Sequence, residues 1–263
     1  MNDKRIKAVI IIGSAARNNY VADEYSDLDL IIATEEPDEW LYGDYPKRFG
    51  NIKISFVEDT LGGAKERRII YKEAGDVDFI VFTPDQLQKA VVSGLANQVM
   101  NRGYIVLYDD MNITKELEKY INPGVRHELM GKEEFLNMVN DFFFHTIWAH
   151  KKIKRGELWT AKMCIDAYLK AYLLKAMEMY VIALHDIDVW HNGRFLEEWL
   201  DDAIQVKLKT CFAHYDKEDM ISALLSSFDL FSELCEVICK ECNYPYPEDE
   251  YMYVKDYFAN NLE

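Results

Sequence analysis

The spacing of apolar positions changes about halfway along the chain, and this change separates two kinds of region. In the first, short apolar or alternating runs with the length of β-strands are divided by polar segments that contain glycine and proline. The runs lie at residues 6–12, 27–33, 52–57, 68–71, 77–82 and 104–108. We therefore predict an α/β region of alternating strands and helices.

In the second region, apolar residues recur at steps of three and four, which is the spacing of a helix face. The first helix is expected over residues 135–153, followed by helices near 158–183, 195–208 and 217–239. Together they predict a helical bundle. The breaker cluster Asn122-Pro123-Gly124 marks the expected boundary, which gives domains at residues 1–120 and 125–263.

Turn signals support the element pattern of the first region. Residues 72–76 predict a hairpin turn between the runs on either side. Thr83-Pro84-Asp85 predicts a helix start, with threonine as the cap, proline in the first turn and an acid that complements the helix dipole. Residues 35–50 predict a loop with one helical turn.

Candidate chemistry gathers directly after the first apolar run. Gly13-Ser14 ends the strand without steric cost and can start a helix, whose free N–H groups favour an anion. Asp27 and Asp29 are two residues apart on the next expected strand, so both carboxylates share one face and the leucines take the other. A phosphate cradle followed by paired carboxylates can hold a nucleotide and a divalent metal.

The order Gly-Ser and then Asp-x-Asp resembles the signature of the nucleotidyltransferase superfamily. The longer pattern, Gly-Ser-x-x-Arg-x-Asn at 13–19 and Asp-Glu-x-x-Asp-x-Asp at 23–29, resembles the aminoglycoside 6-adenylyltransferase (streptomycin adenylyltransferase) family. Looser resemblances lie at residues 140–143, 156–158, 173–175 and 244–248. The resemblance implies an α/β nucleotidyltransferase domain with a small mixed sheet, then an all-α helical bundle that binds the acceptor, with the active cleft between them.

The resemblance also implies roles for the matching residues. Gly13 and Ser14 would hold the triphosphate of ATP, the co-substrate, and Arg17 would neutralise phosphate charge. Asp27 and Asp29 would bind Mg²⁺, as two ions roughly 4 Å apart.

A third metal-site acid is expected from the hairpin. Asp76 and Asp78 share a face, so the pattern alone does not choose between them. The family's third acid starts an apolar strand run, and that resemblance assigns the role to Asp78.

Two acids of the helical half are candidates for acceptor binding. Asp141 falls where the family has a glutamate. Asp166 lies three residues after Met163, which occupies a position that is acidic in the family. Asp78, Asp166 and Asp141 all remain candidates for the general base, and the methionine leaves the identity of the acceptor open.

The net charge of the chain limits the classes of partner that we expect it to bind. With 30 basic and 46 acidic residues the formal net charge is −16, which disfavours a nucleic acid and suits a small cationic substrate. The sequence shows no membrane-spanning run and no signal-peptide layout, so we expect a cytoplasmic location with reduced cysteines. The cysteines at 235, 239 and 242 have the spacing of a packed helix face.

The expected function is Mg²⁺-dependent transfer of AMP from ATP to a hydroxyl of an aminoglycoside antibiotic such as streptomycin, with release of pyrophosphate, as a resistance activity. One alternative is the same chemistry on another small molecule or on a macromolecule. Another is a catalytically inactive nucleotide-binding module, which the presence of candidates for all three metal-site acids disfavours.

Overall fold

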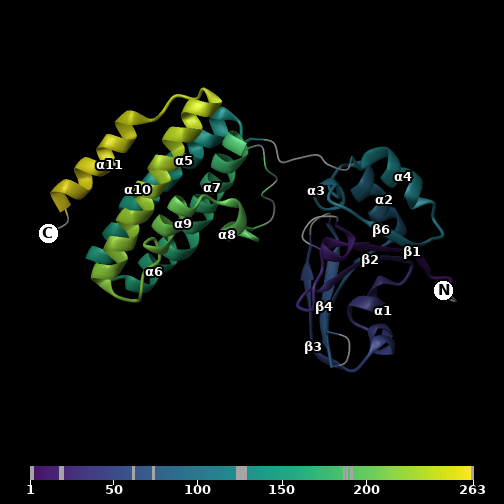
Figure 1. Ribbon diagram of the computed structural model, residues 1–263. Coiled ribbons are helices and arrows are strands. Elements are labelled where there is room, and N and C mark those ends of the chain that lie inside the picture. The colour runs from purple at the N-terminus through teal and green to yellow at the C-terminus, as the bar shows by residue number, and fades with distance from the viewer. Residues whose placement is uncertain are drawn as a thin grey trace. The chain divides into compact units, whose positions relative to one another are not determined.

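The computed structural model describes residues 3–17, 21–60, 63–72, 75–122, 129–185, 187, 189 and 192–261 (Figure 1). Contacts between Cα atoms divide the chain into two compact units, Met1–Val125 and Arg126–Glu263. Asn18 and Asn19 of the glycine–serine motif, and Pro123 and Gly124 of the expected boundary, lie outside the described residues.

The first unit contains the expected small mixed sheet. Its strands are β1 (Ile6–Ile12), β2 (Leu28–Thr34), β3 (Ile52–Asp59), β4 (Lys65–Tyr71), β5 (Gly75–Phe82) and β6 (Ile105–Asp109). The order across the sheet is β3-β4-β5-β2-β1-β6. The pair β2–β5 is parallel and the other neighbouring pairs are antiparallel, so the predicted mixed sheet is confirmed.

Helices cover the two faces of this sheet (Figure 1). On one face, α2 (Pro84–Val92), α3 (Asn97–Met100) and α4 (Ile113–Tyr120) lie over a core of strand isoleucines. On the other face, α1 (Pro37–Leu41) packs against β4 and β5. The predicted start of α2 is confirmed, because the Thr83 side chain accepts a hydrogen bond from the N–H of Gln86 in a capping box.

The connection from β1 to β2 differs from the expected helix. Residues Gly13–Ala16 form a 3₁₀ turn of four residues, and Arg17 follows with extended backbone. Gly13 has φ 70°, a left-handed conformation that does not fit the start of an α-helix. The expected strand at 27–33 begins at Leu28, so Asp27 lies just before β2.

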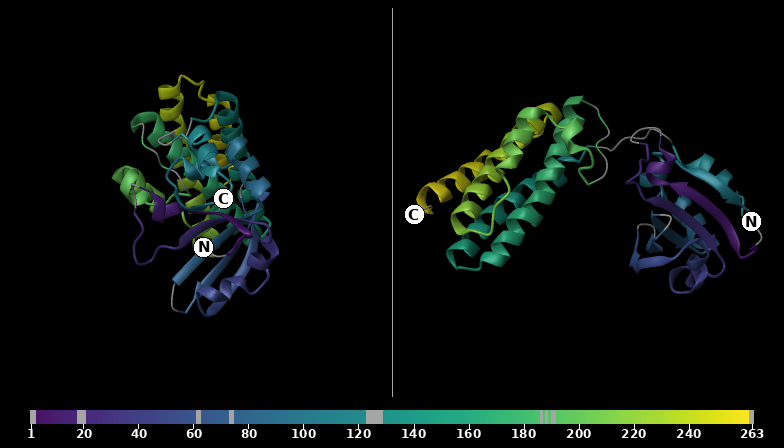
Figure 2. Two further views of the ribbon diagram at one scale, coloured as in Figure 1. Left: turned by 90° about the vertical axis from the view of Figure 1, so that its right-hand side faces the viewer. Right: turned by 60° about the horizontal axis from the view of Figure 1, so that its bottom comes forward.

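The second unit is helical, as predicted. Its helical segments are α5 (Lys132–Lys154), α6 (Leu158–Met163), a π-helical turn η4 (Cys164–Tyr168), α7 (Leu169–His185), α8 (Leu196–Trp199), α9 (Asp202–Lys209), α10 (Lys217–Cys242) and α11 (Glu248–Asn261). Helices α5, α7 and α10 run alongside one another (Figure 2). Phe142 stacks on Phe231 in the core, with ring centroids 3.7 Å apart.

Two details of the helical prediction are wrong. The single helix expected at 195–208 is divided into α8 and α9, because Leu200 leaves the helical conformation at ψ 138°. Helix α11 was not predicted, because its first turn is polar and its apolar face has two buried positions, Val254 and Phe258. Cys235 and Cys239 are buried free thiols, as their spacing predicted. None of the helices in the described residues combines the length and apolarity needed to cross a bilayer.

Candidate active site

Backbone register brings two of the predicted acids together. Because β2 and β5 run parallel, Asp29 pairs directly with Asp78 on the neighbouring strand. Asp27 joins them from the residue before β2, and one carboxylate oxygen of each of the three acids lies within 4.8 Å of the others. Leu28 and Leu30 pack into the core on the opposite face, as the alternation predicted.

The same register separates the two acids that the sequence pattern left open. Asp78 is 5% exposed and belongs to the group of three carboxylates. Asp76 lies two residues nearer the start of β5, pairs with Ile70 and is exposed. The structure therefore places Asp78, and not Asp76, beside Asp27 and Asp29.

The turn after β1 lies directly against this carboxylate cluster. A Cβ atom on Gly13 would lie 2.0 Å from Oδ2 of Asp29, so the approach requires glycine. Ser14 is 4% exposed, and its hydroxyl has no hydrogen-bond partner among the described residues. A buried hydroxyl left without a partner is available to an oxygen-rich ligand. Arg17 lies near enough for its charge to oppose the rise in the pKa of Asp29.

A second glycine lies in close contact with the other side of this turn. A Cβ atom on Gly103, where φ is 139°, would lie 2.2 Å from the carbonyl oxygen of Ala16. The 3₁₀ turn is thus fixed between Gly103 on one side and the carboxylate of Asp29 on the other.

Burial and like charge raise the pKa values of Asp29 and Asp78. Burial raises the pKa of Asp29 to about 6, and the charges of Asp27 and Glu66 add to the rise. Burial raises the pKa of Asp78 to about 7, and the Arg68 guanidinium opposes this rise. A cation bound by the three oxygens would relieve the repulsion, and a set of hard carboxylate oxygens suits Mg²⁺. The residues present therefore fit a divalent metal.

Sequence reasoning missed two members of the site, both on β4. The guanidinium of Arg68 lies 3.3 Å from Oδ2 of Asp78, 2.6 Å from Oε1 of Glu66 and 2.7 Å from Oε1 of Glu58. Glu66 is buried, at 6% exposed. A polar run in a short strand gives little local signal, and only the pairing of β4 with β5 places these side chains beside Asp78.

The acceptor-site candidates lie in the second unit. The hydroxyls of Tyr168 and Tyr172 each donate to the carboxylate of Asp141 at 2.9 Å, and Nδ1 of His145 lies 2.7 Å from its Oδ1. The rings of His145 and Tyr168 are 4.4 Å apart. The available signal was the spacing of four between 141 and 145 and between 168 and 172, which places each pair on one helix face.

Asp166 is differently placed. It lies in the π-helical turn η4, where Lys162 forms an ion pair with its Oδ2. Its Oδ1 is buried without a hydrogen-bond partner among the described residues. No hydrogen bond or ion pair joins Asp166 to Asp141 in the described part of the chain, so the two acids do not form one cluster.

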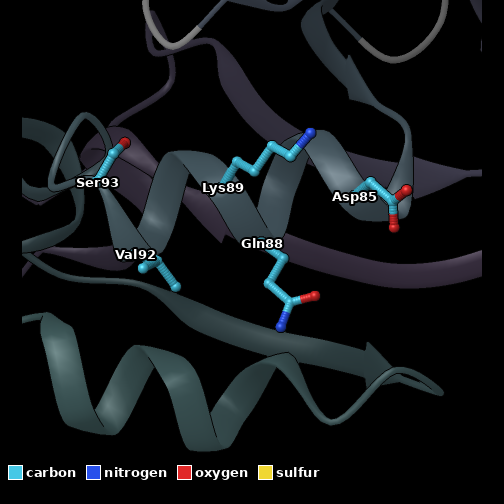
Figure 3. A pocket seen from close by; sticks show the side chains of 5 residues that line it. All are labelled: Asp85, Gln88, Lys89, Val92 and Ser93. Atoms are coloured by element: carbon cyan, nitrogen blue, oxygen red, sulfur yellow. The ribbon is translucent and has the colours of Figure 1, made fainter.

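A large open groove elsewhere on the first unit holds none of these residues. Its volume is about 450 Å³, and it is lined by Asp85, Gln88, Lys89, Val92 and Ser93 of α2 and its end (Figure 3). Figure 3 shows the Lys89 side chain extending toward the Asp85 end of the helix, while the Gln88 side chain points in a different direction. The side chains come from a single helix and do not converge, so we assign no site there.

A mixed sheet that carries clustered carboxylates beside a glycine–serine turn is typical of a nucleotidyltransferase. Over residues 1–261 the chain matches the family model described as streptomycin adenylyltransferase, so it belongs to that family and is a nucleotidyltransferase enzyme. It is similar to the aminoglycoside 6-adenylyltransferase of Bacillus subtilis (strain 168), with 21% identity over an alignment of 287 positions that covers 94% of this chain and 89% of the relative.

Two solved structures are also similar. The crystal structure of an aminoglycoside 6-adenyltransferase from Bacillus subtilis aligns with a TM-score of 0.49 and 16% identity, covering 97% of this chain and 91% of that one. A nucleotidyltransferase-like protein from Exiguobacterium sibiricum 255-15 aligns with a TM-score of 0.31 and 10% identity, covering 91% and 73%.

The close approach of Gly13 to Asp29 can be tested with a matched pair of glycines. Gly75 has φ 73°, almost the same as Gly13, but a Cβ atom there would meet nothing within 4 Å. We expect Gly13→Ala and Gly75→Ala each to lower the free energy of unfolding by about 1–2 kcal/mol, the cost of a left-handed alanine. Only Gly13→Ala should also weaken Mn²⁺ binding in calorimetry, because its methyl group displaces the Asp29 carboxylate. Equal Mn²⁺ binding by both variants would contradict the close approach.

The raised pKa values predict a pH dependence of stability for the metal-free protein. Asp78 has a pKa of about 7 in the folded chain and an ordinary value of 3.8, so the folded state holds a proton that the unfolded state has lost. The free energy of unfolding should therefore fall as pH rises from about 4 to about 7. In EDTA, Asp78→Asn should raise the unfolding temperature above the wild-type value more at pH 8 than at pH 5. Asp85→Asn is the control, and parallel curves for Asp78→Asn would show that burial of this carboxyl carries no such cost.

Proposed function

We propose that this enzyme transfers AMP from ATP to a hydroxyl of an aminoglycoside such as streptomycin, with Mg²⁺ as cofactor and pyrophosphate as the second product. The modification would protect the cell from the drug. The observation that carries the proposal is the group of Asp27, Asp29 and Asp78 within 4.8 Å in a chain of the streptomycin adenylyltransferase family. The similarity to the aminoglycoside 6-adenylyltransferase of Bacillus subtilis supports an aminoglycoside as the acceptor.

In this proposal the turn after β1 receives the triphosphate. The absent side chain of Gly13 lets the backbone lie against Asp29, and the buried hydroxyl of Ser14 donates to a phosphate oxygen. Arg17, at the end of the same turn, offsets part of the negative charge. These three residues hold the nucleotide on the β1 side of the carboxylates.

Asp27, Asp29 and Asp78 would hold the Mg²⁺, as two ions. Bound Mg²⁺ supplies neutralisation of the phosphate charge and of the departing pyrophosphate. The acceptor hydroxyl oxygen attacks the α-phosphorus in line, and the bond from that phosphorus to the pyrophosphate oxygen breaks. The pyrophosphate leaves with the bonding electron pair, and the hydroxyl proton passes to a base.

Asp78 is the best placed of the three candidates for orienting the hydroxyl and accepting its proton. It lies in the carboxylate cluster itself. Asp166 is neutralised by Lys162, and both oxygens of Asp141 already accept hydrogen bonds from tyrosine hydroxyls.

Asp141 instead suits the recognition of a cationic group on the acceptor. Its carboxylate is oriented by His145, Tyr168 and Tyr172, and the faces of the two tyrosine rings can attract the same cation. Asp166 stays a second acceptor-site candidate with the weaker case, because its charge is matched by Lys162. The net charge of −16 supports a small cationic acceptor over RNA, and we place the reaction in the cytoplasm.

Single amide substitutions test the carboxylate cluster. Asp27→Asn and Asp29→Asn keep the shape of the side chains but remove the charges that a divalent metal requires. We expect pyrophosphate release with streptomycin and ATP to fall by at least about a hundredfold in each. The unfolding temperature should not fall in either variant. Asp85→Asn, an exposed acid on α2, should keep full activity. Near-normal transfer by both cluster variants would reject the proposed mechanism.

Asp141→Asn tests the acceptor site separately from the chemistry. We expect the KM for streptomycin to rise about tenfold while the KM for ATP stays unchanged, since the variant loses the negative charge and one tyrosine hydrogen bond of the second unit but leaves the carboxylate cluster of the first unit intact. Glu134→Gln, an exposed acid on the same helix, is the matched control. A rise in both KM values, or no rise in either, would exclude Asp141 from the acceptor site.

A further inference from the structure

The sheet face that carries the carboxylate cluster is covered unevenly within the first unit. On β2 and β5, Ile31 and Ile80 continue this face into the core beneath α2 and α3. On β3 and β4 the same face carries Ile54, Phe56 and Ile70, which are 60%, 52% and 41% exposed. Three neighbouring apolar side chains therefore form an open platform at one end of the sheet.

This platform begins where the carboxylate cluster ends. Across the sheet, Asp29 pairs with Asp78, Asp78 with Arg68, and Arg68 with Phe56. Directly paired residues point to the same face of a sheet, so the row runs unbroken from the acids to the phenyl ring. A pocket of about 220 Å³ lies here, lined by Ile54, Phe56, Ile70, Asp27, Asp76 and Asp78 among others. We call it the β3–β4 pocket.

The charge of the β3–β4 pocket is negative. Arg68 is the basic residue among the described side chains that line it, and Glu58, Glu66 and Asp78 all lie within 3.3 Å of its guanidinium. Asp76 is exposed, and no hydrogen bond or ion pair to another described side chain holds it. The pocket thus combines an apolar floor with an acid that is open to a ligand.

We infer that the β3–β4 pocket binds the acceptor ring whose hydroxyl is attacked, a saturated ring that bears amino or guanidino groups. The apolar face of the ring packs on Phe56, and its cationic group lies near Asp76, where the charges are complementary. Because the pocket shares Asp27 and Asp78 with the carboxylate cluster, a hydroxyl of this ring reaches the reacting centre directly. The inference rests on the proposed function.

The position of the phosphate-binding turn argues against ATP as the occupant. The strand order β3-β4-β5-β2-β1 puts the Gly13–Ser14 turn, which follows β1, on one side of the carboxylates and the β3–β4 pocket on the other. An in-line reaction needs the attacking hydroxyl oxygen and the leaving pyrophosphate on opposite sides of the α-phosphorus. Asp76 would also repel a triphosphate.

Steady-state kinetics with streptomycin and ATP test the pocket. We expect Phe56→Ala and Asp76→Asn each to raise the KM for streptomycin about tenfold, with kcat and the KM for ATP within about twofold of wild type. Leu107→Ala is the control for Phe56, because Leu107 is 59% exposed on β6 at the opposite edge of the sheet. Asp85→Asn is the control for Asp76. Neither control should change any constant.

Calorimetric titration of streptomycin into each protein without ATP separates this inference from the proposed function. Weaker streptomycin binding by both variants supports the pocket, even if the wild type transfers no AMP to the drug. Normal transfer with unchanged KM and unchanged binding in both variants overturns the pocket and leaves the proposed function standing. A rise confined to the KM for ATP overturns it in favour of a nucleotide site. A wild type that neither binds nor modifies streptomycin overturns both.

Discussion

The parallel pairing of β2 with β5 is the constraint on which the site depends. It sets Asp29 directly beside Asp78, and it does so through backbone hydrogen bonds that are indifferent to the repulsion between the two carboxylates. Burial raises the pKa of both acids, and the charge of Asp29 adds to the rise for Asp78. The free energy that stabilises this arrangement comes from the apolar cores on both faces of the sheet. These cores also fix the register of the strands, because a slip of one residue would turn every side chain to the wrong face.

Register explains both what could be predicted from the sequence and what could not. The strands, the cap at Thr83 and the long helices depend on local spacing and turn chemistry, so the pattern of residues was sufficient to predict them. Asp76 and Asp78 share a face, and no local pattern distinguishes them; only the pairing with β2 does. Arg68 and Glu66 are polar residues in a short strand, and their place at the site follows from β4 lying beside β5. The break between α8 and α9 and the π-helical turn at 164–168 likewise left no trace in the apolar spacing.

The close approach of two glycines to neighbouring groups also determines the shape of the site. Gly13 and Gly103 hold the 3₁₀ turn after β1 between a carboxylate and a neighbouring loop, and each would clash if it carried a Cβ atom. A tight turn replaces the expected helix start, so the anion would be held by one short turn, a buried hydroxyl and an arginine. This arrangement depends less on a helix dipole and more on close contact, of Gly13 with Asp29 and of Gly103 with the carbonyl oxygen of Ala16.

Arg68 supplies the positive charge that offsets the clustered acids of β2, β4 and β5 in the folded sheet. Asp27, Asp29, Asp78 and Glu66 all contribute to the local negative potential, and Arg68 contacts two of these four acids together with Glu58. Its guanidinium is engaged by Glu58, Glu66 and Asp78 on several sides. Arg68 therefore helps to hold Asp78 in place while the acids of this face still outnumber it, so in the proposed function a divalent metal at the cluster and a basic acceptor beside it would both meet a negative potential.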